Sequence, residues 1–353
     1  MKLEKYIRKD IRIISLIILV FLFGCSKNFP SNGFDKQQSS DVETANSTIP
    51  PTSAVNQTTI DKPDCLSNHL GQIAFINAQP TPSSLFLMDG NGCNVQEITL
   101  DVSHTLAWAP VSGRLAVICN GTTSICILDT EESVSIGKPL VIERFPLPEQ
   151  CTGRWIGSID WSFDEKNLLI TCGRSFETFY LVKIPISKEQ NSQIIMSSDE
   201  QILRAAWSPV SDNIAVSIPP NIYLIDSSGT NKSKLTDGLS PIWSSDGTKI
   251  IFIKKLDDGI KRGIASITTD GTSLEWLFLP SKPVDLICSE LRPDCRLTLS
   301  PDNKYLAFNG LYYPDTEPGI NYQIFRLDLV EMKVEILSTD TGGRFYSEPD
   351  WGP

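Results

Sequence analysis

Cysteines are the residues whose number and spacing most clearly indicate chemistry in this chain of 353 residues. There are nine of them: Cys25 follows an apolar N-terminal stretch, and the other eight come later in the chain. An even number of cysteines in an exported chain indicates a set of disulfides. We therefore expect disulfides among Cys65, Cys93, Cys119, Cys126, Cys151, Cys172, Cys288 and Cys295.

The spacing of these cysteines suggests how they pair. Cys119 and Cys126 flank a Gly-containing turn between two apolar runs, which predicts a cross-strand disulfide. Cys288 and Cys295 enclose a short polar loop. Other connectivities stay open at this point. The sequential pairs that remain are Cys65 with Cys93, and Cys151 with Cys172.

Motifs for metal, cofactor or nucleophilic chemistry are absent from the sequence. It holds no GxSxG nucleophile elbow, no GxxxxGK[ST] phosphate loop and no GxGxxG dinucleotide loop. The two histidines, His69 and His104, are too few for most His-dependent triads, and without a CxxC pair a zinc site is not expected. The segment 257–259 (DDG) lacks the alternating ligands of a calcium loop and is interpreted as a hairpin turn. We expect no cofactor, no metal and no recognisable catalytic residue.

The N-terminus has the organisation of a lipoprotein signal. Five basic residues lie in the first twelve positions, and an almost uninterrupted apolar stretch follows at 13–23. This stretch is short for a membrane-spanning helix and suits a signal-peptide h-region. The sequence LFGC at 22–25 resembles a bacterial lipobox, which implies that residues 1–24 are removed and that Cys25 is acylated. Lipid chains there would tether the protein to a membrane, whereas an uncleaved N-terminal anchor is the alternative.

Composition separates a spacer from a folded domain beyond this signal. Residues 25–64 are rich in Ser, Thr, Asn, Gln and Pro and show no hydrophobic period, which is typical of a flexible spacer. From residue 65 the chain has the composition of a globular domain. The formal net charge of −11 argues against a nucleic-acid partner and is consistent with a soluble exported domain.

A recurring motif organises the rest of the chain. An apolar run ends at Trp or Leu, a tight turn of Ser, Pro, Asp or Gly follows, and a second apolar run comes directly after it. The cleanest copy is WSSDG at 243–247, followed by IIF. Spacings of 36 to 56 residues between copies are typical of a solenoid or a propeller. The copies begin at Trp108, Trp161, Trp207, Trp243, Leu299 and Trp351.

Each unit contains four short β-rich runs and no amphipathic helix, and such a sheet cannot bury both faces alone. The repeats resemble the TolB-type propeller repeat over nearly the whole folded part. This resemblance implies an all-β, six-bladed propeller of four-stranded antiparallel blades. The copies at Trp108 and Trp207 carry Val-Ser where the family favours Asp-Gly. The β runs at 71–99 lack a first strand, which residues 347–351 can supply, so we expect residues 65–353 to form one ring closed by its C-terminal strand.

Long segments between the predicted strands are where a binding surface is expected. They are residues 131–157, 281–296 and 311–321. The motif tryptophans are interpreted as blade packing, because they recur at the same place in the units. Aromatic residues outside the motif are the candidates for a contact surface, and those in the 311–321 loop are expected to be exposed. The four candidates are Trp155, Trp276, Tyr312 and Tyr313.

The leading hypothesis is a noncatalytic, monomeric lipoprotein on the extracytoplasmic side of a bacterial membrane. It would bind a protein, a peptide or a glycan through one face of the ring. The alternative is a propeller enzyme, either a lyase or a glycan-acting hydrolase, with its site in the central channel; a third possibility is a structural part of an envelope complex. Convergent Asp, Glu, Arg and His side chains at the channel mouth would favour the enzyme, and small or apolar lining would favour binding.

Overall fold

The computed structural model describes the folded domain and leaves the predicted signal peptide and the whole spacer, Cys25 included, outside the described residues, together with His69 and Cys288. In the part of the chain that the structure describes, no helix is long and apolar enough to cross a membrane. The described residues are 65, 70–77, 83–98, 100–174, 177–187, 189–259, 261–281, 284–286, 295–313, 321–338 and 346–353.

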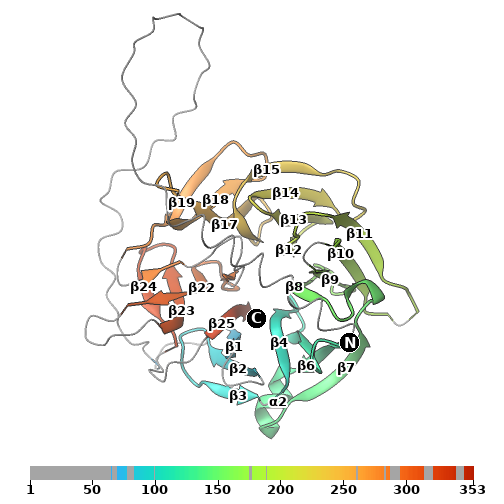
Figure 1. Cartoon of the computed structure of the whole chain (residues 1–353). Helices are drawn as coiled ribbons and strands as arrows, with labels where there is room; N and C mark the ends of the chain where they lie inside the picture. The colour runs from blue at the N-terminus through green and yellow to red at the C-terminus, as the bar shows by residue number, and fades with distance from the viewer. Residues whose placement is uncertain are drawn as a thin grey trace, which may run out of the picture. The chain divides into compact units, whose positions relative to one another are not determined.

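The described strands form six antiparallel sheets, which are the six blades of a propeller (Figure 1). From inner to outer strand, blade 1 consists of β25 (Tyr346–Gly352), β1 (Gln72–Asn77), β2 (Ser84–Asp89) and β3 (Gln96–Ile98). Blade 2 consists of β4 (Val102–Trp108), β5 (Arg114–Cys119), β6 (Ser124–Asp129) and β7 (Leu140–Pro146). Blade 3 consists of β8 (Trp155–Trp161), β9 (Asn167–Gly173), β10 (Phe179–Pro185) and β11 (Gln193–Ser198). Blade 4 consists of β12 (Arg204–Trp207), β13 (Asn213–Ile218), β14 (Asn221–Asp226) and β15 (Ser233–Asp237). Blade 5 consists of β16 (Leu239–Trp243), β17 (Lys249–Lys255), β18 (Arg262–Thr268) and β19 (Leu274–Phe278). Blade 6 consists of β21 (Leu297–Leu299), β22 (Tyr305–Tyr312), β23 (Asn321–Asp328) and β24 (Val334–Ile336), and β20 (Val284–Asp285) also pairs with β22.

The inner strands contact one another around a closed ring. Each of β25, β4, β8, β12, β16 and β21 touches the next, and β21 touches β25 again. The ring confirms the all-β, six-bladed propeller predicted from the repeats. Five of the six inner strands end at the motif Trp or Leu, and β25 extends one residue past Trp351.

The two ends of the described domain share blade 1. Strand β25 pairs antiparallel with β1, with Trp351 opposite Ile73 and Gly352 opposite Gln72. A register shift follows between Ala74 and Ile76. The C-terminal segment therefore supplies the missing first strand, as predicted.

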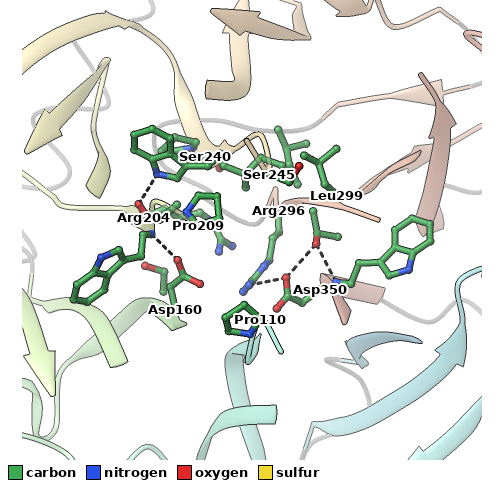
Figure 2. A pocket seen from close by; sticks show the side chains of 18 of the residues that line it. Pro110, Asp160, Arg204, Pro209, Ser240, Ser245, Arg296, Leu299 and Asp350 are labelled. Carbon is green, nitrogen blue, oxygen red and sulfur yellow. Dashed lines mark hydrogen bonds and ion pairs between the residues drawn. The ribbon is translucent and has the colours of Figure 1, made fainter. Parts of the chain in front are cut away.

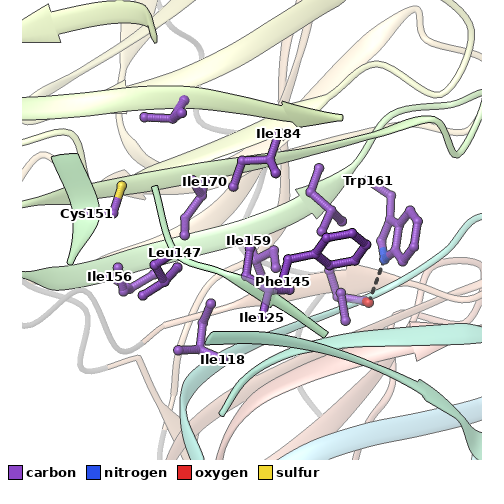
Figure 3. Close-up of a cluster of buried hydrophobic side chains, with 14 of the residues drawn as sticks. Ile118, Ile125, Phe145, Leu147, Cys151, Ile156, Ile159, Trp161, Ile170 and Ile184 are labelled. Atoms are coloured by element: carbon purple, nitrogen blue, oxygen red, sulfur yellow. Dashed lines mark hydrogen bonds between the residues drawn. The ribbon is translucent and has the colours of Figure 1, made fainter. Parts of the chain in front are cut away.

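Apolar side chains from neighbouring blades form the core. Between blades 2 and 3, Ile118 and Phe145 pack with Ile159, Ile170 and other buried residues in one cluster (Figure 3). Strand alternation places one face of each sheet against each neighbouring blade, so both faces of a blade become buried only when the ring forms.

The segment 131–157 corrects the sequence-based expectation of an insertion without helix. It contains the short helix α2 (Thr130–Ile136), which begins at an Asp129 cap and ends at Gly137 in the left-handed region. It also contains the outer strand β7 and the 3-10 helix η1 (Glu149–Cys151). The fourth strand of blade 2 was missed because α2 separates it from β6.

Disulfides join the predicted cysteines. The bond between Cys119 and Cys126 links β5 to β6 within blade 2. Cys295 is also disulfide-bonded, and its predicted partner Cys288 lies outside the described residues. The other two described bonds are Cys65–Cys93 and Cys151–Cys172, the latter between η1 and β9.

Candidate functional site

Three motif tryptophans, Trp108, Trp161 and Trp243, hydrogen-bond to the blade before their own, whereas the indole N–H of Trp207 has no hydrogen-bond partner among the described residues. The indole N–H of Trp161 donates to the main-chain oxygen of Ala107 at 3.0 Å, and the same atom of Trp243 donates to the main-chain oxygen of Ala206 at 2.9 Å. In both pairs the acceptor is the residue directly before the motif Trp of the preceding blade. The described motif tryptophans are all less than one tenth exposed. These contacts hold the ends of the inner strands in fixed positions around the channel.

A cavity of about 380 Å³ lies at this end of the channel (Figure 2). All six blades line it, because it is formed by the last residues of the inner strands and by the turns that follow them. One lining residue from each blade, from blade 1 to blade 6, is Asp350, Pro110, Asp160, Arg204, Ser240 and Arg296.

Two buried arginines cross the channel and are paired with carboxylates of blade 1. Arg204 forms an ion pair with Glu348, and Arg296 lies 3.6 Å from Glu348 and 3.1 Å from Asp350. Burial acts to lower the pKa of Arg296, but the charges of Asp350 and Glu348 outweigh it and raise the pKa. Because a buried charge is costly without a partner, these pairs hold the centre of the ring in one arrangement.

Asp350 is fully engaged in this network. Its Oδ2 accepts a hydrogen bond from the main-chain N–H of Trp108 at 2.7 Å, and its Oδ1 accepts one from the hydroxyl of Thr298 at 3.2 Å. With the Arg296 pair, both carboxylate oxygens are used. Asp350 therefore joins blades 1, 2 and 6.

Asp160 holds the same place in blade 3, directly before the motif Trp, but it is partnered differently. Its Oδ2 accepts from the main-chain N–H of Trp207 at 2.7 Å, and among the described residues no ion pair joins it to a cation. Burial raises the pKa of Asp160 most, and the negative charge of Asp350 raises it further. The hydrogen bond from Trp207 and the positive charge of Arg296 lower it. The net result is a pKa of about 7. At neutral pH this carboxyl group is thus partly protonated and lines the cavity.

The turns around the cavity expose apolar side chains on three blades and carboxylates on four. On blades 2, 3 and 4 the turn after the inner strand exposes an apolar side chain, and we call these three residues the apolar rim: Val111 (78% exposed), Phe163 (39%) and Val210 (57%). Exposed aspartates lie in the same turns of four blades: Asp164 on blade 3, Asp212 on blade 4, Asp246 on blade 5 and Asp302 on blade 6. The Val-Ser copies noted in the sequence are therefore the ones that place valine at the rim.

Glu165 fixes the apolar rim between blades 2 and 3. Its Oε1 accepts from the main-chain N–H groups of Val111 and Ser112 at 2.7 and 2.8 Å. Its Oε2 lies 3.1 Å from Arg114, whose guanidinium stacks over the ring of Trp161 at 4.9 Å. These contacts fix the backbone of the Val111 turn against blade 3.

The four aromatic candidates from the sequence are not gathered at the cavity, although Trp155 and Tyr312 pack against the same buried apolar cluster. Trp155 begins β8, at the opposite end of the inner strand from the cavity, and Trp276 lies in the outer strand β19. Tyr312 ends β22, and both it and Tyr313 are half-buried where the loop was expected to expose them. None of the four lines the cavity. Their role in a contact surface stays a prediction.

The charged cluster of the channel was missed by the sequence analysis. Its members are separated by almost 200 positions in the chain, and only ring closure brings them together. One local signal does exist, since Asp160 and Asp350 each precede a motif Trp. Within the described residues, no group of three or more His, Cys, Asp or Glu side chains is arranged to hold a metal ion.

Comparison with known proteins identifies the fold. The chain matches no protein-family model and no curated protein. Among solved structures it is similar to TolB from Acinetobacter baumannii, with 17% identity and a TM-score of 0.59 over 80% of this chain and 67% of that one. It is also similar to a protein described as a TolB of Agrobacterium tumefaciens, with 15% identity and a TM-score of 0.51 over 81% of this chain and 100% of that one. The chain therefore has the TolB-like six-bladed β-propeller fold.

Proposed function

We propose that this protein is an exported lipoprotein that binds a segment of a partner protein or a peptide at the mouth of its channel. The observation that carries the proposal is the open cavity lined by all six blades, beside the exposed apolar rim. Exposed apolar groups on a rigid surface favour a protein contact. A glycan is favoured less, because the tryptophan rings near the cavity are buried and offer no open face for a sugar.

The proposed location rests on chemistry at the N-terminus and on the disulfides. Disulfides persist in oxidising compartments, which supports an extracytoplasmic domain. Residues 1–24 would be the signal peptide, Cys25 the acylated residue, and 25–64 the spacer that holds the monomeric propeller away from the membrane. Labelling with an alkyne analogue of palmitate tests this directly: the wild-type chain should incorporate it and Cys25→Ser should not.

Binding at the channel mouth is tested by copurification in mild detergent from the native membrane. A partner should accompany the wild-type chain and be lost from the double variant Val111→Ser/Val210→Ser. The matched control is Val330→Ser, because Val330 is also 78% exposed but lies in the turn between the two outer strands of blade 6. Equal recovery of the partner with the rim variant and with the control would contradict the proposal.

A channel enzyme is the second candidate, and one observation favours it. Charged side chains do converge in the channel, and Asp160 has a pKa of about 7, which suits a general acid near neutral pH. Against this, Asp350, Glu348 and both arginines are ion-paired with one another. The test is a panel of soluble polysaccharides assayed for new reducing ends and for unsaturated products: turnover that is lost in Asp160→Asn would establish the enzyme, and its absence across the panel would favour binding.

A further inference from the structure

We propose that the channel mouth takes a positively charged side chain, a lysine or an arginine of the bound segment, against Asp160, with apolar neighbours of that side chain on the apolar rim. This inference rests on the proposed function and specifies the chemistry of the partner. It follows from the charge balance of the channel, from the state of Asp160 and from the position of the rim.

The charges in the channel do not cancel. Three carboxylates, Asp160, Glu348 and Asp350, face two guanidinium groups, Arg204 and Arg296, and the described lining of the cavity contains no lysine or histidine. When all five groups are ionised the cluster carries one negative charge, as three carboxylates minus two guanidinium groups. A single additional cation would balance it.

Two carboxylates of this network, Glu348 and Asp160, could accept a further cationic donor. Glu348 is only 4% exposed, yet its Oε2 accepts no hydrogen bond from any described residue and its cation contact is Arg296 at 3.6 Å. Asp160 accepts hydrogen bonds but has no ion pair among the described residues. Both arginines are ion-paired with carboxylates, and the excess charge of the cluster is negative, so the cavity favours a cation over an anion.

Asp160 provides a reason for the binding to depend on pH. The charged groups around it are Asp350, Glu348, Arg204 and Arg296, each of which is paired. Asp160 titrates near pH 7, so at lower pH it is protonated and cannot pair with a cation. Binding of a lysine or an arginine should therefore strengthen as the pH rises through 7.

The apolar rim lies beside Asp160 and not on the far side of the mouth. Asp160 belongs to blade 3, and its carboxylate is bonded to blade 4, while the rim residues belong to blades 2, 3 and 4. A segment with one basic residue between apolar ones would place the basic side chain against Asp160 and its apolar neighbours on the apolar rim.

The probe is a set of heptapeptide libraries whose central residue is Lys, Arg, Gln or Glu and whose neighbours are mixed apolar residues. They are applied to the immobilised full-length chain at pH 6 and pH 8, and retained peptides are quantified by mass spectrometry. We expect the Lys and Arg libraries to be retained roughly tenfold or more over the Gln and Glu libraries at pH 8, with a smaller ratio at pH 6.

Variants assign the preference to the site. Asp160→Asn keeps an oxygen that can accept from Trp207, and it should abolish the preference for a basic centre. Glu97→Gln removes the same charge from the exposed outer strand β3 and should leave the preference intact. Val111→Ser/Val210→Ser should reduce retention of all libraries, and Val330→Ser should not.

The outcomes separate this inference from the proposed function. Equal retention of all four libraries, no retention of any, or an unchanged preference in Asp160→Asn would overturn the basic-residue inference. The proposed function would still be judged by whether the native partner is lost with the rim variant. A preference for Lys or Arg that is lost in Asp160→Asn supports the inference.

Discussion

The indole N–H of Trp351 donates to the main-chain oxygen of Leu70 at 2.6 Å, across a sequence separation of 281 residues. This bond lies in blade 1, where the C-terminal strand pairs with β1. The same strand carries Glu348 and Asp350, the acceptors for the two channel arginines. Closure of the ring and assembly of the channel site are thus one structural event.

Deletion of residues 346–353 should strongly destabilise the domain. It removes the inner strand of blade 1 together with the buried side chains of Tyr346 and Trp351, and it leaves two buried arginines without their carboxylate partners. The expected loss is on the order of 5 kcal/mol or more. Thermal unfolding measures it, and an unchanged melting temperature would refute the closure by β25.

The ring motif could be predicted from the sequence because its causes are local. The Trp243 copy shows this: Asp246 accepts hydrogen bonds from its own turn, and Gly247 adopts a positive φ of 68°. Such turn chemistry is visible in a few adjacent residues. The channel cluster depends instead on side chains contributed by different blades, and whether Asp160 finds a cation there cannot be inferred from its neighbours in the chain.

Breaking the pair between Arg204 and Glu348 should be costly in either single variant. Both residues are more than nine-tenths buried, so Arg204→Met leaves a buried carboxylate under-compensated, at an expected cost of about 3–5 kcal/mol. The double variant Arg204→Met/Glu348→Gln should recover part of this loss. As a control, Arg174→Met removes an exposed pair with Glu177 and should cost less than about 1 kcal/mol. Additive losses in the double variant, measured by chemical denaturation, would show that the pair is not coupled.

Asp160→Asn should change how stability depends on pH. The folded-state pKa is raised from 3.8 to about 7, so the folded protein holds a proton that the unfolded chain releases between these values. The free energy of unfolding contributed by this group is therefore highest at low pH and falls as the pH rises toward 7, by up to about 4 kcal/mol. The difference in free energy of unfolding between Asp160→Asn and wild type should therefore favour the variant more at pH 8 than at pH 4. A stability difference that does not vary with pH would contradict the assigned state of Asp160.

Removal of the Cys151–Cys172 disulfide by the double variant Cys151→Ser/Cys172→Ser should cost about 3 kcal/mol, because the bond closes a loop of 21 residues between η1 and β9. Nonreducing peptide mapping of the wild-type chain checks the pairing itself. It should recover the three described bonds and a fourth peptide pair that joins Cys288 to Cys295. Four or more free thiols would refute the disulfide framework.

Binding of a partner at the channel mouth is tested most directly by site-specific photocrosslinking in intact cells. A photoreactive amino acid is placed at Val111, at Val210 or, as the control, at Val330, all of which are exposed. We expect the same discrete protein adduct from Val111 and Val210 and none from Val330. Adducts of equal yield from all three positions, or from Val330 alone, would contradict binding at the channel mouth.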